Sequence, residues 1–366
     1  MSRPRRRTTN SLTIKSKDYK DPEIQRIIAS LPFSSNGYLF SQVLGSGSFG
    51  VVFKAYHSGY KRDFAAKMIS MVSKDQASSD AIDIESEFKT LMRLSHQNII
   101  KIYGSFQYMH QFVIILQYCP NGTLKNLIQS GVGIPKDEQK AFIKSIVNAL
   151  TYSHEKNVAH RDIKTANIFI DSFRRPILSD FGLSQILPLE SASLFSFCGS
   201  FIYRSPEMIL QKPHDPFKAD VWALGVTFYI MVTGRDPWPT YSVDAMKKAI
   251  VSCQFEPFPE TVEPEIVDLI KLMLTLDPNQ RPSMAELSQL DWIQNSEMQL
   301  QSKRIETGVN QSQSVCKSKR FQMKYFQSVS QCLSFKVSKQ GRSASRLETE
   351  ETEAPYVGKL LFLPDE

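Results

Sequence analysis

The hydrophobic pattern of this chain is mainly that of strands before Cys119 and mainly that of helices after it, and this change limits the folds open to the chain. Between Gly37 and Cys119, short runs rich in β-branched and aromatic residues alternate with turn residues, as in YLFSQVL, GVVFKAY, DFAAKMI, NIIKIYGSF and FVIILQYC. From Gly122 onward the apolar residues follow a helical period, as in EQKAFIKSIVNALTYSHEK, KADVWALGVTFYIMVTG and EIVDLIKLMLTL. A strand-rich part followed by a helix-rich part predicts an α+β fold.

The positive charge of the chain is concentrated at its two ends. Residues 1–37 hold 8 Lys/Arg against 3 Asp/Glu, residues 38–295 hold 25 against 26, and residues 296–366 hold 11 against 8. The neutral body argues against a nucleic-acid-binding domain, so no nucleic-acid partner is expected. The five cysteines lack metal-ligand spacing, which indicates a reduced, intracellular protein. We expect a cytoplasmic location, and the Arg-rich start leaves a nuclear signal or a mitochondrial presequence as alternatives.

A glycine-rich segment follows the first predicted strand. Gly45, Gly47 and Gly50 stand in a G-x-G-x-x-G frame, and such glycines let a backbone approach phosphate oxygens and offer its amides to them. A dinucleotide-binding turn has the same spacing but opens a helix. Here β-branched and aromatic residues follow, so the segment is predicted to be a hairpin, which either binds phosphate or is a plain glycine-rich turn.

Lys67 lies inside the apolar run FAAKMI, where an unpaired ammonium group would be costly. A helical pattern at residues 81–94, AIDIESEFKTLMRL, offers Glu85 or Glu87 as its partner. The alternative is a lysine whose alkyl stem is buried while its charged end reaches solvent.

The stretch NVAHRDIKTANIFI, residues 157–170, places five polar residues between two apolar runs. It is either a solvated turn or a set of polar groups held at a reaction centre. Four further motifs follow it in the chain: Asp-Phe-Gly at 180–182, Ser-Pro-Glu at 205–207, Asp-Val-Trp-Ala-Leu-Gly at 220–225, and Arg281.

In this order and spacing, the motifs resemble those of eukaryotic protein kinases over about residues 38–295. The resemblance implies a bilobal fold, with a β-rich N-lobe at about 38–116 that includes one regulatory helix, and a mainly helical C-lobe at about 120–295. It implies a serine/threonine protein kinase that uses ATP and Mg²⁺ on protein substrates, loosely similar to the calcium/calmodulin-dependent group. The rival interpretation is a pseudokinase scaffold. Its usual mark is the loss of a residue equivalent to Lys67, Asp162 or Asp180, and all three are present.

The resemblance also implies roles for individual residues. Asp162 would orient the substrate hydroxyl and accept its proton, and Lys164 would neutralise the transferred phosphoryl group. Asn167 and Asp180 would be the Mg²⁺ ligands. Lys67 would hold the ATP phosphates and pair with Glu87, which fits the family spacing better than Glu85. The other expected nucleotide-binding residues are Gly45, Ser46, Gly47, Gly50, Val52, Ala65, Gln117, Cys119 and Phe169, with Leu116 as gatekeeper.

The resemblance carries expectations about substrates. Lys164 resembles the serine/threonine branch, and Leu183 is similar to the residue of kinases that prefer serine. Thr165-Ala166 stands where arginine-directed kinases have Pro-Glu, and Thr123 and Ile230 also replace carboxylates found in some of them. With little to attract arginine, we expect weak or absent selectivity for basic substrates.

Regulation is expected to act through the segment between Asp180 and Glu207. Ser196 stands where many kinases carry an activating phosphate, which an upstream kinase would add, and Arg161 would receive it. Ser191 and Ser193 are alternatives to Ser196. Ser200 is expected to bridge Asp162 and Lys164 through its hydroxyl.

Both ends of the chain are expected to be tails, with residues 1–37 basic and disordered and residues 296–366 mostly disordered. Between Glu306 and Glu348 every charged residue is basic, and four apolar residues recur at intervals of four: Phe321, Tyr325, Val329 and Leu333. A basic amphipathic helix there would suit an anionic membrane, a calmodulin-like partner or an autoinhibitory contact with the kinase domain. The alternative is a disordered linker whose periodicity arose by chance.

Overall fold

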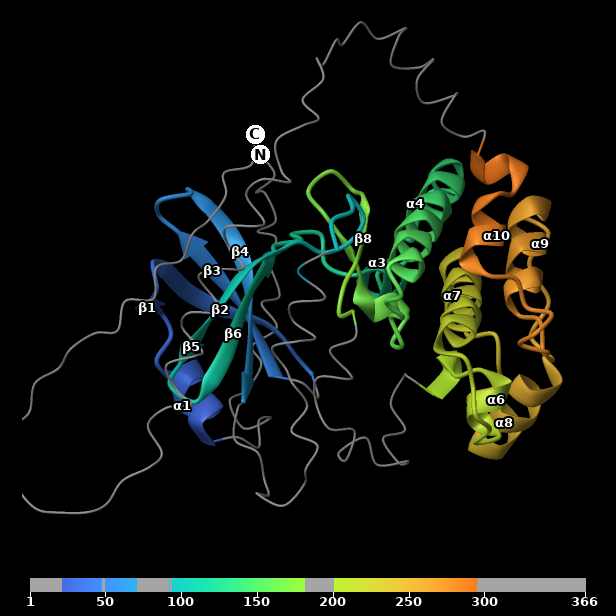
Figure 1. Ribbon diagram of the computed structural model, residues 1–366, viewed down its shortest axis with the longest axis horizontal. Helices are drawn as coiled ribbons and strands as arrows, with labels where there is room; N and C mark the ends of the chain where they lie inside the picture. The colour runs from blue at the N-terminus through green and yellow to red at the C-terminus, as the bar shows by residue number, and fades with distance from the viewer. Residues whose placement is uncertain (1–21, 48–49, 71–91, 93, 182–200, 295–366) are drawn as a thin grey trace, which may run out of the picture. The chain divides into compact units, whose positions relative to one another are not determined.

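The computed structural model describes residues 22–47, 50–70, 92, 94–181 and 201–294 (Figure 1). All of them belong to one compact unit that ends at Glu297. The predicted helix at 81–94, apart from Met92 and Leu94, and the predicted C-terminal tail from residue 296 lie outside the described residues.

Six antiparallel strands form one sheet in the order β1-β2-β3-β4-β6-β5 (Figure 1, blue to teal). They are β1 Phe33–Ser35, β2 Tyr38–Gly47, β3 Gly50–His57, β4 Arg62–Ser70, β5 Ile102–Tyr108 and β6 Gln111–Gln117. Alternate side chains of β3 are buried, because successive residues of a strand face opposite sides of the sheet. The five strands predicted from the sequence, β2 to β6, are therefore confirmed.

The glycine-rich segment forms the β2–β3 hairpin, as predicted, and Gly47 pairs with Gly50 across it. Gly50 has φ +124, and a Cβ atom there would lie 2.0 Å from the Met68 carbonyl oxygen of β4. Only glycine fits this position, because any side chain would collide with the neighbouring backbone.

Regular structure occurs within residues 22–37, where the sequence predicted a disordered tail. Helix α1, Pro22–Ala29, buries Ile24 and Ile27, and β1 pairs with β2. Glu23 of α1 binds the β5–β6 turn: its Oε1 lies 3.0 Å from Nδ1 of His110, and its Oε2 accepts from Nε2 of Gln111 at 2.8 Å. The prediction of disorder for residues 1–37 is thus wrong for residues 22–37. The basic composition of the residues before them obscured a short amphipathic helix.

The second part of the described chain is mainly helical (Figure 1, green to orange). Its helices are α3 Leu124–Gln129, α4 Lys136–Glu155, α6 Pro206–Ile209, α7 Pro216–Thr233, α8 Val243–Ser252, α9 Pro264–Met273 and α10 Met284–Ser288. Helix α7 is buried from Asp220 to Met231 and packs beside α9. Asp215 caps its first turn through the Phe217 amide, and Gly234 ends it at φ 71. In the described ranges, no helix is long and apolar enough to span a membrane.

Two 3₁₀ turns and a hairpin complete this part, and two of these elements lie within the segment at 157–170. They are the 3₁₀ turn η2, Thr165–Asn167, the hairpin of β7, Ile168–Ile170, with β8, Pro176–Leu178, and the 3₁₀ turn η4, Phe201–Tyr203. An antiparallel sheet followed by a helical part confirms the predicted α+β, bilobal fold.

Candidate active site

The apolar residues of the segment at 157–170 anchor it in the core, and its polar residues form one cluster. Ile163, Ile168 and Ile170 are buried. With three of its apolar residues fixed in the interior, the loop between them has a defined backbone. The interpretation as a plain solvated turn is therefore excluded.

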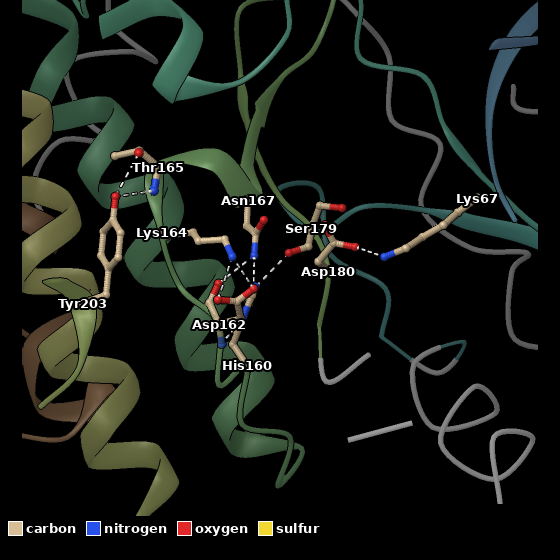
Figure 2. A network of polar contacts seen from close by, with 9 residues as sticks. All are labelled: Lys67, His160, Asp162, Lys164, Thr165, Asn167, Ser179, Asp180 and Tyr203. Carbon is tan, nitrogen blue, oxygen red and sulfur yellow. Dashed lines mark hydrogen bonds and ion pairs between the residues drawn. The ribbon is translucent and has the colours of Figure 1, made fainter. Parts of the chain in front are cut away.

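Asp162 is the centre of the polar cluster (Figure 2). Nζ of Lys164 lies 2.9 Å and 2.7 Å from its two carboxylate oxygens. Nδ2 of Asn167 donates to the Asp162 carboxylate at 2.9 Å and to its backbone oxygen at 2.8 Å. The structure therefore brings together three of the residues singled out from the sequence.

A second charged pair lies beside this cluster, as Figure 2 shows. Nζ of Lys67, from β4, lies 2.5 Å from Oδ1 of Asp180, which follows β8. Burial works to raise the pKa of Asp180, but Lys67, with smaller contributions from His160 and Lys164, holds the pKa below its ordinary value. Glu87, the predicted partner of Lys67, lies outside the described residues.

The backbone is strained on both sides of the cluster. Arg161 has φ 66 and Asp180 has φ 62, in the left-handed region that side chains with a Cβ atom rarely adopt. Asp220 of α7 stabilises the first of these turns, because its carboxylate accepts from the amides of His160 and Arg161, each at 2.7 Å. Left-handed non-glycine residues concentrate at functional sites, where surrounding contacts hold them in place.

His160 links the cluster to the Asp180 segment. Its Nε2 lies 2.9 Å from the Ser179 carbonyl oxygen, which can only accept, and its Nδ1 accepts from the Asp162 amide at 3.3 Å. These partners define a neutral ring protonated on Nε2. Burial lowers the pKa of His160, which favours the same neutral form. The ring also packs on Phe181, with centroids 4.5 Å apart.

Most of the predicted adenine-binding residues lie on strands of the sheet. Ala65 and Leu116 are buried cross-strand partners, and Val52 pairs with Lys67. The Gln117 amide donates to the Lys101 oxygen at 2.9 Å, which leaves the Gln117 carbonyl and the Cys119 backbone as candidates for a planar base. Burial raises the pKa of the Cys119 thiol to about 12, so this cysteine is not a nucleophile.

Asn167 and Asp180 offer two hard oxygen ligands for a cation. The side chain of Asn167 makes its two hydrogen bonds to Asp162 through Nδ2, so its Oδ1 is the atom that suits a metal. Asp180 has a second carboxylate oxygen besides the one bound to Lys67. No group of three or more His, Cys, Asp or Glu in the described ranges could hold a metal. The two oxygen ligands from Asn167 and Asp180 suit Mg²⁺, which takes one or two carboxylate ligands and completes its shell with water and phosphate oxygens.

Several residues given a role from the sequence lie outside the described residues: Glu87, Leu183, Ser191, Ser193, Ser196 and Ser200. Arg161 is exposed and its backbone is held by Asp220. Because Ser196 lies outside the described residues, the prediction that Arg161 receives a phosphate stays a prediction.

Comparison with known proteins agrees with this geometry. The protein kinase domain model matches residues 38–293, which is more than half of the chain. A Zea mays protein named "Probable serine/threonine-protein kinase CCRP1" is 31% identical over 263 residues, covering 71% of this chain and 41% of that protein. The chain belongs to the eukaryotic serine/threonine protein kinase family.

Other relatives of this kinase have varied names. CBL-interacting protein kinase 25 of Oryza sativa subsp. japonica is 29% identical over 262 residues, or 70% of this chain and 51% of that protein. Mitogen-activated protein kinase kinase kinase YODA of Arabidopsis thaliana is 33% identical over 256 residues, or 69% of this chain and 29% of that protein. The kinase thus spans about half or less of the length of these three relatives.

Sequence reasoning gave no role to Asp220, although it supports the strained turn before Asp162. It is buried, and its carboxylate also lies 3.0 Å from Nε2 of His154. The sequence could have indicated this role, because Asp220 begins the apolar run DVWALGVTFYIM. A carboxylate buried with such a run requires hydrogen-bond donors from elsewhere in the chain.

Proposed function

We propose that this kinase transfers the γ-phosphoryl group of ATP to the hydroxyl of serine, and less readily threonine, in protein substrates. The observation that carries the proposal is the cluster around Asp162, with Lys164 and Asn167 bound to its carboxylate and the Lys67–Asp180 pair beside it. A carboxylate among fixed cations and amides suits phosphoryl transfer, which depends on positioning and charge neutralisation.

In this proposal Asp162 accepts the proton of the substrate hydroxyl. Its carboxylate is half-buried and fixed by Lys164 and Asn167, so it has a defined direction toward an incoming hydroxyl. Lys164 already lies within 2.9 Å of both carboxylate oxygens, so its ammonium group is close enough to neutralise the charge that develops on the phosphoryl group.

Lys67 holds the ATP phosphates, and Asn167 and Asp180 hold Mg²⁺. When bound, the metal supplies positive charge that neutralises the phosphate oxygens. The β2–β3 hairpin contributes backbone amides near Gly45 and Gly47. In the described structure a Cβ atom at Gly45 would meet nothing within 4 Å, so there is room above this glycine.

Substrate choice in the proposal follows from charge. Thr123, Ala166 and Ile230 carry no carboxylate, and Lys125, two residues after Thr123, is exposed on α3. An arginine in the substrate therefore has little to bind, and weak or absent basic selectivity is expected. We further propose that phosphorylation of Ser196 by an upstream kinase regulates activity through Arg161.

The test of the proposed function is phosphate transfer by the full-length chain to a generic protein substrate in the presence of Mg-ATP. Wild type should give mainly phosphoserine, and Asp162→Asn should reduce the rate by at least roughly 100-fold. Asp137→Asn, an exposed carboxylate at the start of α4, is the matched control and should retain the rate.

The alternative function, a pseudokinase scaffold, predicts a different result. Wild type and Asp162→Asn would then give the same background signal, while nucleotide binding measured by a shift in melting temperature could persist. Equal phosphate transfer by wild type and Asp162→Asn would refute the proposed kinase activity.

A further inference from the structure

The loop at residues 160–167, which carries Asp162, makes a second contact that the proposed phosphate transfer does not use. Oγ1 of Thr165 lies 3.0 Å from the hydroxyl oxygen of Tyr203, and the Thr165 amide donates to the same oxygen at 3.5 Å. Thr165 is 4% exposed, so its hydroxyl needs a partner within the protein. Figure 2 shows the Thr165 side chain directed away from Asp162 and toward Tyr203.

The same loop is therefore held from two sides. Lys164 and Asn167 bind Asp162, while Thr165, which follows Lys164 and begins η2, binds Tyr203 of η4. Lys164 has an extended backbone, with φ −164 and ψ 163, which turns adjacent side chains to opposite sides of the chain. A change in the position of Tyr203 would thus be transmitted within two residues to the groups that fix Asp162.

The segment on the other side of the contact is suited to a peptide chain. Phe201, Ile202 and Tyr203 are half-buried and pack against the hydrophobic core, so each also presents part of its side chain outward. Nε1 of Trp238 donates to the Ile202 carbonyl at 2.9 Å and fixes the segment from the α7–α8 connection. A partly exposed apolar segment bound to the loop that carries Asp162 would contact residues adjacent to the phosphorylated serine.

Threonine is the residue that makes this contact chemically available. Proline, which stands at this position in arginine-directed kinases, has neither a side-chain hydroxyl nor an amide hydrogen. Thr165 supplies both groups to one oxygen. Burial raises the pKa of Tyr203, so its hydroxyl keeps its proton at neutral pH and can donate as well as accept.

We propose that Thr165 and Tyr203 form a positioning pair that fixes the peptide-binding segment at Phe201–Arg204 relative to Asp162. The pair touches neither ATP nor the transferred group and acts through the loop. The inference rests on the proposed kinase function. It adds two residues that set how well a protein substrate is presented for transfer.

The kinetic test uses the full-length chain with Thr165→Val, Tyr203→Phe, the double variant and Thr165→Ser. Thr165→Val and Tyr203→Phe should each lower kcat/KM for a peptide substrate roughly 3- to 10-fold, the size expected for one hydrogen bond. The KM for ATP should stay within about 2-fold of the wild-type value. The double variant should lose no more than the worse single variant, because both remove the same contact. Thr165→Ser keeps the hydroxyl and should recover most of the loss.

Thr151→Val is the matched control. Its hydroxyl is buried in α4 and donates to the Met284 oxygen at 3.1 Å, so the change removes a comparable bond away from the site. It should lower the melting temperature without changing kcat/KM for the peptide. Unchanged kcat/KM in Thr165→Val, multiplied losses in the double variant, or an equal rise in the KM for ATP would each overturn the pair.

Amide hydrogen exchange separates this inference from the proposed function. Exchange at residues 201–205 should become faster in Thr165→Val and not in Thr151→Val, whether or not the protein transfers phosphate. Unchanged exchange there would overturn the positioning pair even if wild type is active. An inactive wild type would refute the proposed function, and the exchange comparison would still decide whether the pair fixes this segment.

Discussion

Nζ of Lys67 and Oδ1 of Asp180 lie 2.5 Å apart although 113 residues separate them in the sequence. Lys67 comes from the sheet and Asp180 follows the β7–β8 hairpin, so this ion pair joins the two parts of the candidate site. The Lys67 side chain is 8% exposed and the Asp180 side chain 31%. Lys67 therefore depends on the ion pair more than Asp180 does, because its ammonium charge has little access to water.

Lys67→Met should abolish most of the phosphate transfer while preserving the fold. Methionine fills the apolar part of the site but cannot hold phosphate oxygens or Asp180, so kcat/KM should fall roughly 100- to 1,000-fold. Rates are measured beside Lys212→Met, an exposed lysine after α6, which should behave as wild type. An active Lys67→Met protein would contradict the role proposed for this residue.

Arg281→Lys should destabilise the helical part strongly. Arg281 is fully buried and forms a bidentate pair with Glu207 at 2.8 Å and 3.1 Å, and its Nη1 also donates to the Lys218 oxygen at 2.8 Å. Lysine cannot reproduce this fork, so the free energy of unfolding should fall by about 3–5 kcal/mol. Urea unfolding measures it, with the exposed Arg174→Lys as the control, expected within about 0.5 kcal/mol of wild type.

The protonation of His160 should make the unfolding free energy depend on pH. Burial lowers the pKa of His160 below its ordinary value, although Asp220, Asp162 and Asp180 act in the opposite direction. The unfolded chain therefore takes up a proton first as the pH falls below about 6.5, and the folded state loses stability there. His160→Phe retains a ring beside Phe181 and should show a shallower fall in unfolding free energy between about pH 6.5 and 5. Parallel curves for the two proteins would exclude this role of His160.

Ala166→Glu should create selectivity that wild type lacks. Ala166 is half-buried in η2, beside Asn167, and a glutamate there would place a carboxylate near a bound substrate. Peptide-library phosphorylation should show little preference for arginine in wild type and a clear preference in the variant, of roughly 3- to 10-fold. Strong arginine preference in wild type would show that another acidic group performs this task.

The sequence predicted the strands and the polar cluster well because both depend on local patterns. Alternation in β2 to β6 follows from a sheet with a buried face, and Asp162, Lys164 and Asn167 are close in the chain, so a single short loop brings them together. The family resemblance supplied Asp180, whose distance along the chain from Lys67 no periodicity could bridge.

Contacts between distant residues were not visible in the same way. Asp220 supports the turn at Arg161 from 59 residues away, and Thr165 binds Tyr203 from 38 residues away. Nothing in the spacing of these residues indicates that they meet, because their contact depends on how α7 and η4 pack against the loop. Thr165 was singled out for the carboxylate missing beside it, whereas the structure gives it a hydrogen bond of its own.

Helix α1 was missed because the residues before it are strongly basic and suggested a tail. Its eight residues are too few to be stable alone, so it depends on burying Ile24 and Ile27 and on the bonds of Glu23 to the β5–β6 turn. Ile27→Ala should therefore lower the unfolding free energy by about 2–4 kcal/mol. Arg26→Ala, exposed on the same helix, is the control and should stay within about 0.5 kcal/mol of wild type. Equal stability of the two variants would show that α1 is not a working part of the domain.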